Sequence, residues 1–313
     1  MNKGHKIKTL LSHYNKKSVK KTKKIKFFGI ENKDVYNITA PFKIKRSTYI
    51  LGRVEPREHE IGSRAMFFKR IKGQSSWHLV ENFPIFDLQD PFISFLKDNF
   101  FIGGVETLQK SNKLGLSFRT VFYKGKKLDK INYFSKGPWG MKDIRFIQLD
   151  NNDIAVFTRP QGRKGRRGKI GFTILSSIKS LSPRVLTRAE IIQNQFARGE
   201  WGGVNEIHIL KNNKLGILGH IAKFDKNKNR YYYPITFLFD YKTREFSGMK
   251  ILATRNEIPK TESKKPDLYN VIFPGGLIRL KNKLAKLYCG VSDVEAYELT
   301  IEDPFLEYET EED

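Results

Sequence analysis

The chain has 313 residues and a formal net charge of +25, and it carries a single cysteine, Cys289. One cysteine excludes an intrachain disulfide framework and a multi-cysteine metal site. It favours a reducing compartment, so we expect a cytoplasmic protein. No apolar run is long enough to cross a membrane as a helix, so no membrane span is expected.

The first 30 residues predict a segment outside the folded domain. Residues 1–26 contain ten lysines and no acidic residue, and they lack apolar periodicity. This composition is typical of a flexible arm. We therefore expect a basic arm over residues 1–30, one catalytic domain over residues 31–300 and an acidic tail over residues 301–313.

Five segments repeat one pattern along the expected domain. Each has a polar, proline or glycine corner, an apolar run, a turn of Lys, Asn or Asp, and a second apolar run. The segments are residues 40–53, 88–106, 142–159, 205–220 and 274–290. Corners that recur at intervals of roughly 50 to 70 residues indicate propeller blades. The sequence therefore predicts an all-β fold, a five-bladed β-propeller whose corners converge on a central axis, with one helix near residues 187–194.

Asp90 begins the second of these segments and is followed by Pro91. Proline fixes the backbone and suits the first residues of a strand, so Asp90 is expected at the entrance of a sheet. A carboxylate held there beside aromatic residues is a candidate proton donor. The alternative is that the Asp-Pro step only starts a strand.

Arginines and histidines near other strand ends are candidate ligands for hydroxyl groups or phosphate. Arg53 and Arg159 end second strands, and His220 takes the corresponding place in the fourth segment. Guanidinium groups clamp such ligands through paired hydrogen bonds, although most strand-end arginines are simply exposed. His208 and His220 lie on opposite strands of one hairpin, so a helical zinc-protease motif is absent. No metal site is expected.

The positive charge raises the question of a nucleic-acid partner, because clustered lysine and arginine bind phosphate backbones. Much of the lysine falls in the N-terminal segment and in hairpin turns such as 211–214 and 281–283, where solvated charge is ordinary. The Gly/Arg run over residues 161–169 matches neither a P-loop nor a dinucleotide fingerprint and is interpreted as a mobile basic loop. Nucleic acid is therefore not the expected partner.

Two tryptophans lie near segment corners. Trp139 and Trp201 are each followed by glycine. A flat indole face can carry a sugar ring, and core packing is the alternative for both side chains.

Short motifs in all five segments resemble those of the inverting β-mannoside phosphorylases of glycoside hydrolase family 130. The Asp90-Pro91 step is similar to the acidic corner of that family, and motifs at 158–160, 219–220, 271–276 and 288–293 follow in the same order. The sequences at 52–55, 88–92 and 139–143 look closer still to a sister group, the β-1,2-mannan mannosyltransferase/phosphorylases of glycosyltransferase family 108. Two features depart from the phosphorylase pattern. Phe92 replaces an arginine, and His208 lies near the place of an expected lysine.

The resemblance implies an inverting enzyme that transfers mannose reversibly between the end of a β-1,2-mannooligosaccharide and phosphate or GDP. It implies mannose 1-phosphate or GDP-mannose as donors, and no cofactor beyond inorganic phosphate as a co-substrate. Asp90 would be the catalytic acid. The residues expected to bind substrate are Asn37, Arg53, Arg64, Asp143, Asn205, Glu206 and Asp293. The residues expected to bind phosphate are Lys142, Arg159, His208 and His220.

Two alternatives stay open at this point. An inverting hydrolase on the same fold needs a second carboxylate about 6.5 to 9.5 Å from the acid to activate water, and Glu206 and Asp143 are the candidates. A non-catalytic propeller would instead bind a glycan or a polyanion through its basic face. A phosphorylase needs only one protein acid, because phosphate itself attacks the sugar.

Overall fold

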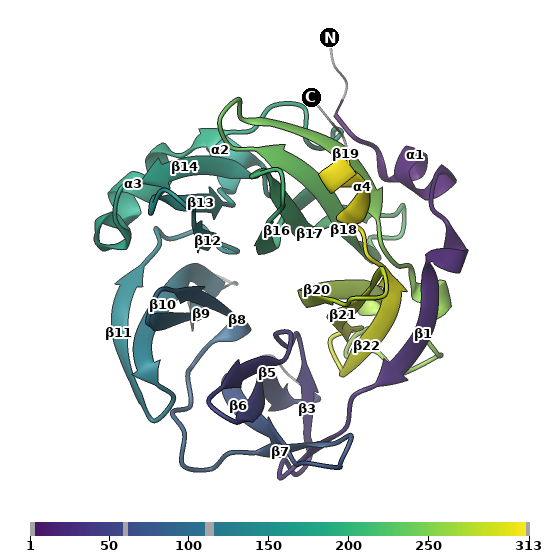
Figure 1. The fold of residues 1–313 in the computed structure, drawn as a ribbon. Coiled ribbons are helices and arrows are strands. Elements are labelled where there is room, and N and C mark those ends of the chain that lie inside the picture. The colour runs from purple at the N-terminus through teal and green to yellow at the C-terminus, as the bar shows by residue number, and fades with distance from the viewer. Residues whose placement is uncertain (1–3, 59–61, 110–115, 311–313) are drawn as a thin grey trace.

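The computed structural model of the chain describes residues 4–58, 62–109 and 116–310. These residues form an all-β fold in which antiparallel sheets surround a central axis (Figure 1). The α-helices in this part of the chain are short: α1 (Ile7–Ser12), α2 (Gly162–Gly165), α3 (Pro183–Arg188) and α4 (Leu306–Thr310). Among the described residues, no helix has the length and apolar character needed to cross a membrane.

Residues 27–191 supply three of the sheets. The six-stranded sheet contains β2 (Phe27–Phe28), β3 (Lys33–Tyr36), β4 (Phe42–Ile44), β5 (Ser47–Pro56), β6 (Arg64–Arg70) and β7 (Trp77–Leu79). The next sheet contains β8 (Gln89–Leu96), β9 (Asn99–Gln109), β10 (Leu116–Lys127) and β11 (Lys130–Lys136). The third contains β12 (Arg145–Gln148), β13 (Ile154–Thr158), β14 (Gly171–Leu175) and β15 (Glu190–Ile191).

The remaining strands form one eight-stranded sheet made of two antiparallel groups. The first group is β16 (Trp201–Ile209), β17 (Leu215–Phe224), β18 (Arg230–Asp240) and β19 (Glu245–Ile251). The second is β20 (Asn270–Arg279), β21 (Leu284–Val291), β22 (Glu295–Glu302) and β1 (Val19–Lys24). Only a short parallel pairing of β18 with β20 joins the groups. Strands β8, β12, β16 and β20 lie nearest the axis in Figure 1, and β1, β7 and β11 lie at the periphery.

All five predicted hairpins are present, and their turns share one backbone feature. Each turn contains a non-glycine residue with a positive φ angle. These residues are Lys45, Lys97, Asn152, Asn213 and Lys283. Two of the five are Asn, which adopts the left-handed conformation more readily than most residues. The Lys/Asn/Asp turns of the sequence thus lie at the hairpin turns of the structure.

The core lies between neighbouring sheets and combines aliphatic side chains with many aromatic ones. Between the third sheet and β18, for example, Phe157, Phe172 and Phe239 are buried, with ring centroids 4.8 to 5.1 Å apart. Edge-on and tilted aromatic contacts at this spacing are favourable beyond the area they bury. The packed layers fix the strands whose ends carry the polar corners.

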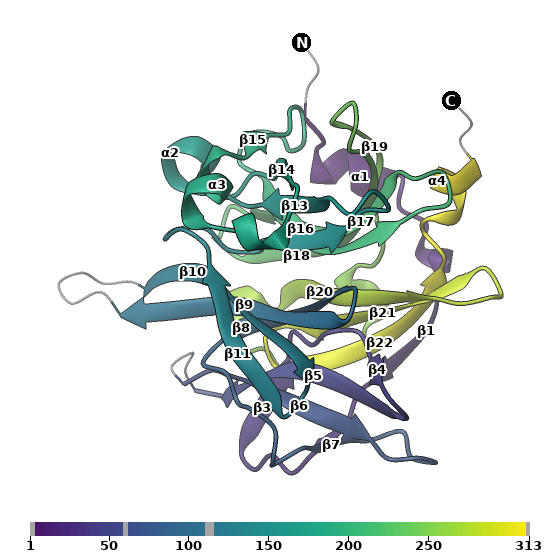
Figure 2. The same ribbon diagram turned by 60° about the vertical axis from the view of Figure 1, so that its left-hand side comes forward.

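The prediction of a flexible N-terminal arm is wrong for residues 4–30. Strand β1 pairs antiparallel with β22, and both ribbon views show the two strands side by side (Figures 1 and 2). Ile7 and Leu10 of α1 are buried in the core. The lysines of β1 face solvent, and two of them pair with acidic residues of β22: Lys20 with Glu302 at 2.7 Å, and Lys24 with Glu295. The lysine-rich composition therefore reflects an edge strand that is complementary in charge to its partner.

The acidic C-terminal segment is also packed against the fold. Strand β22 continues to Glu302, and Phe305 and Tyr308 are completely buried. Arg279 binds both carboxylate oxygens of Glu309, at 2.7 and 2.8 Å. The expected tail therefore begins inside the last sheet and ends in α4, and residues 311–313 lie outside the described residues.

Two local predictions in the third sheet need correction. The helix expected near residues 187–194 is α3, which ends at Arg188, and β15 follows it because Glu190–Ile191 pairs with β14. The Gly/Arg run at 161–169 is attached to the same region. Lys164 Nζ donates to the carbonyls of Thr187 and Ala189 at 2.6 and 2.7 Å. The run is therefore docked, in contrast to the mobile loop that its composition suggested.

Candidate active site

Four polar corner residues near the inner strands share a strained backbone conformation. Asn37, Asp90, Asp143 and Asp293 have φ angles of 43°, 49°, 54° and 54°. Asn and Asp tolerate this left-handed conformation, and such residues cluster at functional sites because the surrounding structure has to enforce them. At Asp90 the conformation coincides with an irregularity in the pairing of β8 with β9, between Gln89 and Phe92. The sequence placed Asp90 correctly at the entrance of its sheet.

Asp90 is buried and held from the first sheet. Its Oδ1 accepts a hydrogen bond from Asn37 Nδ2 at 2.7 Å and another from Arg53 Nη1 at 3.1 Å. Only 8% of the residue is exposed. Asn37 and Arg53 therefore orient one carboxylate oxygen, as a positioned proton donor requires.

Arg53 is itself fixed by a buried carboxylate, Glu55. Arg53 Nε and Nη2 both donate to Glu55 Oε2, at 3.1 and 2.9 Å. Burial alone would lower the pKa of Arg53, but the negative charges around it, including Asp90 and Asp293, raise that pKa above its usual range. Asp293 of the last sheet is therefore close enough to Arg53 to interact with it.

A second buried pair joins Asp143 to Arg159. Arg159 Nη1 donates to Asp143 Oδ2 at 2.9 Å, and Arg159 Nε donates to the carbonyl of Gly202 at 2.8 Å. Burial would raise the pKa of Asp143, but Arg159 and then Lys142 hold it at about 2. Asp143 is thus a permanent anion at neutral pH, which makes it a poor base for activating water.

His220 and Asn205 form the third part of the group. His220 Nδ1 lies 2.8 Å from Asn205 Oδ1. An amide oxygen only accepts, so Nδ1 donates and Nε2 of the neutral ring is an acceptor. Burial, followed by the charge of Arg159, lowers the pKa of His220 to about 3. His220 is therefore neutral and suited to accept a hydrogen bond from a hydroxyl, which corrects its expected role as a cation for phosphate.

Arg145 connects these parts and was not among the predicted site residues. Its Nε donates to the carbonyl of Asn205 at 2.9 Å, and its guanidinium carbon lies 3.9 Å from the centre of the Phe92 ring. Burial lowers the pKa of Arg145 to about 10, against the opposing effects of Asp143, Asp90 and Glu206. Phe92, which departs from the phosphorylase pattern, thus supports an arginine supplied by another sheet. The only sequence signal was the position of Arg145 two residues after Asp143.

We call Asn37, Arg53, Asp90, Asp143, Arg145, Arg159, Asn205 and His220 the axial cluster. Four of its buried polar atoms make no hydrogen bond to any described residue: Asn37 Oδ1, Asp143 Oδ1, Asn205 Nδ2 and His220 Nε2. Buried polar groups are nearly always paired, so unpaired ones concentrated in one place indicate a binding or catalytic role. The cluster offers such a site both acceptors and a donor.

Besides Lys142 and Asp293, which border the cluster, three predicted residues are not members of it, and one of these, Glu206, is near enough to Arg145 to affect its pKa. Glu206 Oε2 accepts hydrogen bonds from the backbone of Leu277 at 2.6 Å and from His208 Nε2 at 2.9 Å. His208 packs on Phe305. The strand partner of His220 is Gly203, and His208 lies five residues further along β16. Five residues of extended strand span roughly 15 Å, so His208 is far from His220. His208 is therefore removed from the phosphate-binding set.

Arg64 is the third predicted residue outside the cluster. It is partly exposed and pairs with the exposed Asp87 at 2.8 Å. It belongs to the rim of the first sheet and does not contact Asn37 or Asp90 in the described contacts. Its expected role in holding the reacting sugar is not supported by this geometry.

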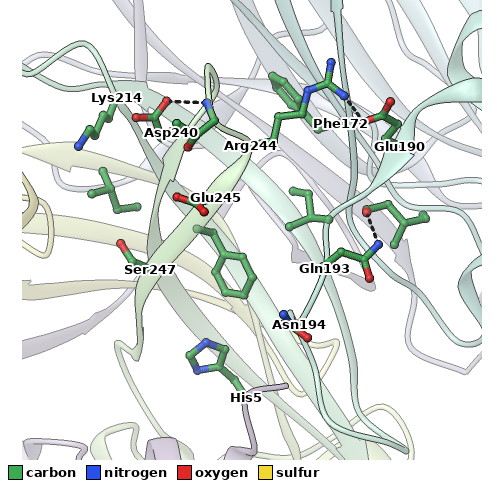
Figure 3. A pocket seen from close by; sticks show the side chains of 15 residues that line it. His5, Phe172, Glu190, Gln193, Asn194, Lys214, Asp240, Arg244, Glu245 and Ser247 are labelled. Atoms are coloured by element: carbon green, nitrogen blue, oxygen red, sulfur yellow. Dashed lines mark hydrogen bonds and ion pairs between the residues drawn. The ribbon is translucent and has the colours of Figure 1, made fainter. Parts of the chain in front are cut away.

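The axial cluster differs in kind from a large cavity at the outer side of the fold. That cavity, of about 1110 Å³, is lined by β14, β15, β18, β19 and His5 (Figure 3). Two charged residues in its wall, Arg244 and Glu190, pair with each other. No group of three potential metal ligands occurs in the described part of the chain. The buried, strained and unpaired groups are at the axial cluster, and we assign the candidate site to it.

Buried charged groups together with unpaired polar atoms at the ends of the inner strands are features expected of an active site. A family model described as "Protein of unknown function (DUF1861)" matches residues 12–307, and the chain belongs to this family. No curated protein sequence matches the chain.

Solved structures of *Leishmania mexicana* proteins are similar over nearly the whole chain. A mannose phosphorylase, MPT-4, in complex with phosphate ion is 31% identical, with a TM-score of 0.89 over 97% of this chain and 95% of that one. A GDP-Man-dependent mannosyltransferase, MPT-1, is 30% identical, with a TM-score of 0.84 over 93% of this chain and 92% of that one. The resemblance to mannosyltransferase/phosphorylases is thereby confirmed.

A more distant structure shares the fold. The β-1,2-mannobiose phosphorylase from *Listeria innocua* is 13% identical, with a TM-score of 0.65 over 90% of this chain and 94% of that one. At this identity the likeness concerns the fold alone. It agrees with the propeller-type arrangement of sheets around the axis.

Proposed function

We propose that the protein is an inverting mannoside phosphorylase and mannosyltransferase. It transfers mannose reversibly between the end of a β-1,2-mannooligosaccharide and phosphate, giving mannose 1-phosphate, or GDP, giving GDP-mannose. In the same proposal the antiparallel groups of strands are the blades of a five-bladed propeller, with the eight-stranded sheet counted as two blades. The two similar *Leishmania* enzymes, one a phosphorylase and one a GDP-Man-dependent transferase, support both donors.

The observation that carries the proposal is the setting of Asp90. It is a buried carboxylate with one oxygen fixed by Asn37 and Arg53. In the proposed reaction Asp90 donates a proton to the departing oxygen, directly or through a sugar hydroxyl, while phosphate attacks the anomeric carbon from the opposite face. General acid catalysis of this kind contributes about 10²- to 10⁴-fold to the rate.

The remaining members of the axial cluster divide between binding the sugar and neutralising phosphate. Lys142 and Arg145 act on the charge of Asp143, so their own charges lie beside it. They are the cations that we assign to phosphate, with Arg159 supporting them through its pair with Asp143. His220 Nε2 and Asn37 Oδ1 are acceptors, and we assign them to mannose hydroxyls.

The test is a product assay on the wild-type protein. β-1,2-Mannobiose and longer oligomers are incubated with and without phosphate, and mannose 1-phosphate and free mannose are measured. The proposal expects mannose 1-phosphate that depends on added phosphate. Abundant free mannose in phosphate-free buffer would instead identify a hydrolase, and no product under either condition would leave a glycan-binding protein.

The phosphate assignment has its own test in Lys142. Lys142→Met removes one charge near Asp143 but leaves the Asp143–Arg159 pair intact. We expect a higher KM for phosphate and little change in KM for the oligosaccharide, because the charge opposite the nucleophile is lost. Lys136→Met, an exposed lysine on β11, is the matched control. An equal effect of both substitutions would contradict the assignment.

A further inference from the structure

Trp139 is exposed, unlike the other two tryptophans. It is 46% exposed, whereas Trp77 and Trp201 are 5% and 4% exposed. Trp201 packs on Phe224 and donates its indole N–H to Tyr232 Oη at 3.2 Å, so it belongs to the core. The exposed indole therefore leaves a large, flat aromatic surface available to a ligand.

The segment that carries Trp139 is fastened to β10. Gly137 N donates to the carbonyl of Thr120 at 2.7 Å, and Gly140 N donates to the carbonyl of Phe118 at 2.8 Å. Gly140 has a φ angle of 78°, a conformation that glycine adopts without cost. The indole therefore projects from a backbone that is held on both sides.

One face of the indole is covered by a fixed cation. The guanidinium carbon of Arg119 lies 4.2 Å from the centre of the Trp139 ring. Arg119 Nε in turn donates to Glu106 Oε2 at 2.6 Å. This stack orients the ring in advance, so a ligand that binds the indole has little side-chain entropy to overcome.

The indole lies at the same end of the sheets as the axial cluster. Glu106 follows Val105, the strand partner of Gln89, and Gln89 directly precedes Asp90. Met141, two residues after Trp139, bridges to Pro160, which follows Arg159. Lys142 and Asp143 come next in the chain.

We propose that Trp139, supported by Arg119, is a platform for a sugar ring of the oligosaccharide beyond the mannose that reacts. The proposal rests on the proposed function and extends it with a further binding site. A pyranose has an apolar C–H face that stacks on an indole and a rim of hydroxyls that pairs with groups such as Glu106 and Arg119. Asp90 is buried and Trp139 is exposed, so the ring on Trp139 is the more outward one.

Substrate length is the variable that tests this site. Wild type, Trp139→Ala and Trp139→Phe are compared with β-1,2-mannobiose and β-1,2-mannotetraose in the presence of phosphate. For Trp139→Ala we expect kcat/KM with the tetraose to fall about 5- to 10-fold, the size of an aromatic stacking contact, and kcat/KM with the biose to stay within about twofold. Trp139→Phe keeps a ring and should retain most of the activity. Tyr133 of β11 is another exposed aromatic residue. Tyr133→Ala is the control and should leave kcat/KM unchanged with both substrates.

Three outcomes would overturn the platform. They are equal losses on the biose and the tetraose, no loss on either, and, when transfer from GDP-mannose is assayed in parallel, a loss confined to that donor, which would assign the indole to the nucleoside base. If wild type transfers no mannose at all, the proposed function fails separately. Tryptophan fluorescence then still tests the platform by titration with mannotetraose alone. An emission change in wild type that is absent in Trp139→Phe supports it, and no change in wild type overturns it.

Discussion

The ammonium group of Lys264 donates a hydrogen bond to the carboxylate of Glu55, and the two side chains are 1% and 0% exposed. They come from positions 209 residues apart, since Lys264 lies in the connection between β19 and β20. Glu55 also accepts from Arg53, which binds Asp90. A chain of alternating charges thus runs from a remote loop to the proposed acid.

Lys264→Met should destabilise the protein because it leaves Glu55 with one cation fewer in a buried setting. Breaking a buried ion pair in this way costs about 3 kcal/mol or more, so we expect the melting temperature to fall by roughly 5 to 10 °C. Thermal unfolding measures the effect. Lys260→Met, an exposed lysine of the same loop, is the control and should have no effect. An unchanged melting temperature for Lys264→Met would contradict the role of the pair.

Asp90→Asn should lower turnover by about 10²- to 10⁴-fold, because the amide cannot act as the general acid. The fold should survive, since the amide oxygen can still accept from Asn37 and Arg53. Turnover of β-1,2-mannobiose with phosphate and the circular dichroism spectrum measure the two effects. Asp98→Asn changes an exposed aspartate in the turn of the same hairpin and serves as the control. Near-normal turnover in Asp90→Asn would remove Asp90 from the catalytic role.

Arg159→Met should reduce stability more than its expected place in the phosphate site would suggest. The substitution leaves Asp143 as an unpaired buried anion, which costs about 3 to 5 kcal/mol. The double variant Arg159→Met/Asp143→Asn removes the orphaned charge and should recover part of this loss. Urea unfolding of the two single variants and the double variant gives the coupling energy. Additive losses would show that the pair contributes no coupling.

The free energy of unfolding should fall as the pH is lowered below the ordinary pKa of histidine. The ordinary pKa of a histidine side chain is 6.5, and the pKa of His220 is lowered to about 3 in the folded protein, first by burial and then by Arg159. Between these values the unfolded chain binds a proton that the folded protein does not, so acid favours unfolding. From pH 7 to pH 5 this single group contributes a loss of about 2 kcal/mol.

Unfolding by urea at pH 7 and pH 5 measures this slope. His220→Gln should reduce the loss between the two pH values, because no group titrates at that position. A slope that His220→Gln leaves unchanged would assign the acid sensitivity to other groups.

Deletion of residues 1–24 should lower the melting temperature markedly, because it removes the strand that pairs with β22 and the buried apolar residues of α1. The control is the double variant Lys21→Gln/Lys23→Gln, which changes two exposed lysines without placing a negative charge opposite β22 and keeps the strand. It should melt close to wild type. A deletion variant with the same melting temperature as wild type would show that this segment is dispensable for stability.

Local sequence signals predicted the hairpins and the position of Asp90, because a turn and the strands beside it are set by neighbouring residues. Features that depend on distant residues were missed. The pairing of β1 with β22 and the contact of Lys264 with Glu55 leave no periodic trace in the sequence. The contact of the Arg145 guanidinium with the Phe92 ring joins two sheets, so local sequence does not predict it. The neutral state of His220 follows from its burial, which cannot be read from composition.

The pairing of β1 with β22 has a consequence for how the chain reaches this fold during synthesis. Strand β1 emerges from the ribosome among the first elements, but its partner is made only after β20 and β21. Until then β1 is an unpaired edge, and its exposed lysines discourage pairing with another chain. Closing so large a loop is a late and slow event compared with forming the hairpins. The pairing of β1 with β22 therefore forms last, after the sheets between these two strands have folded.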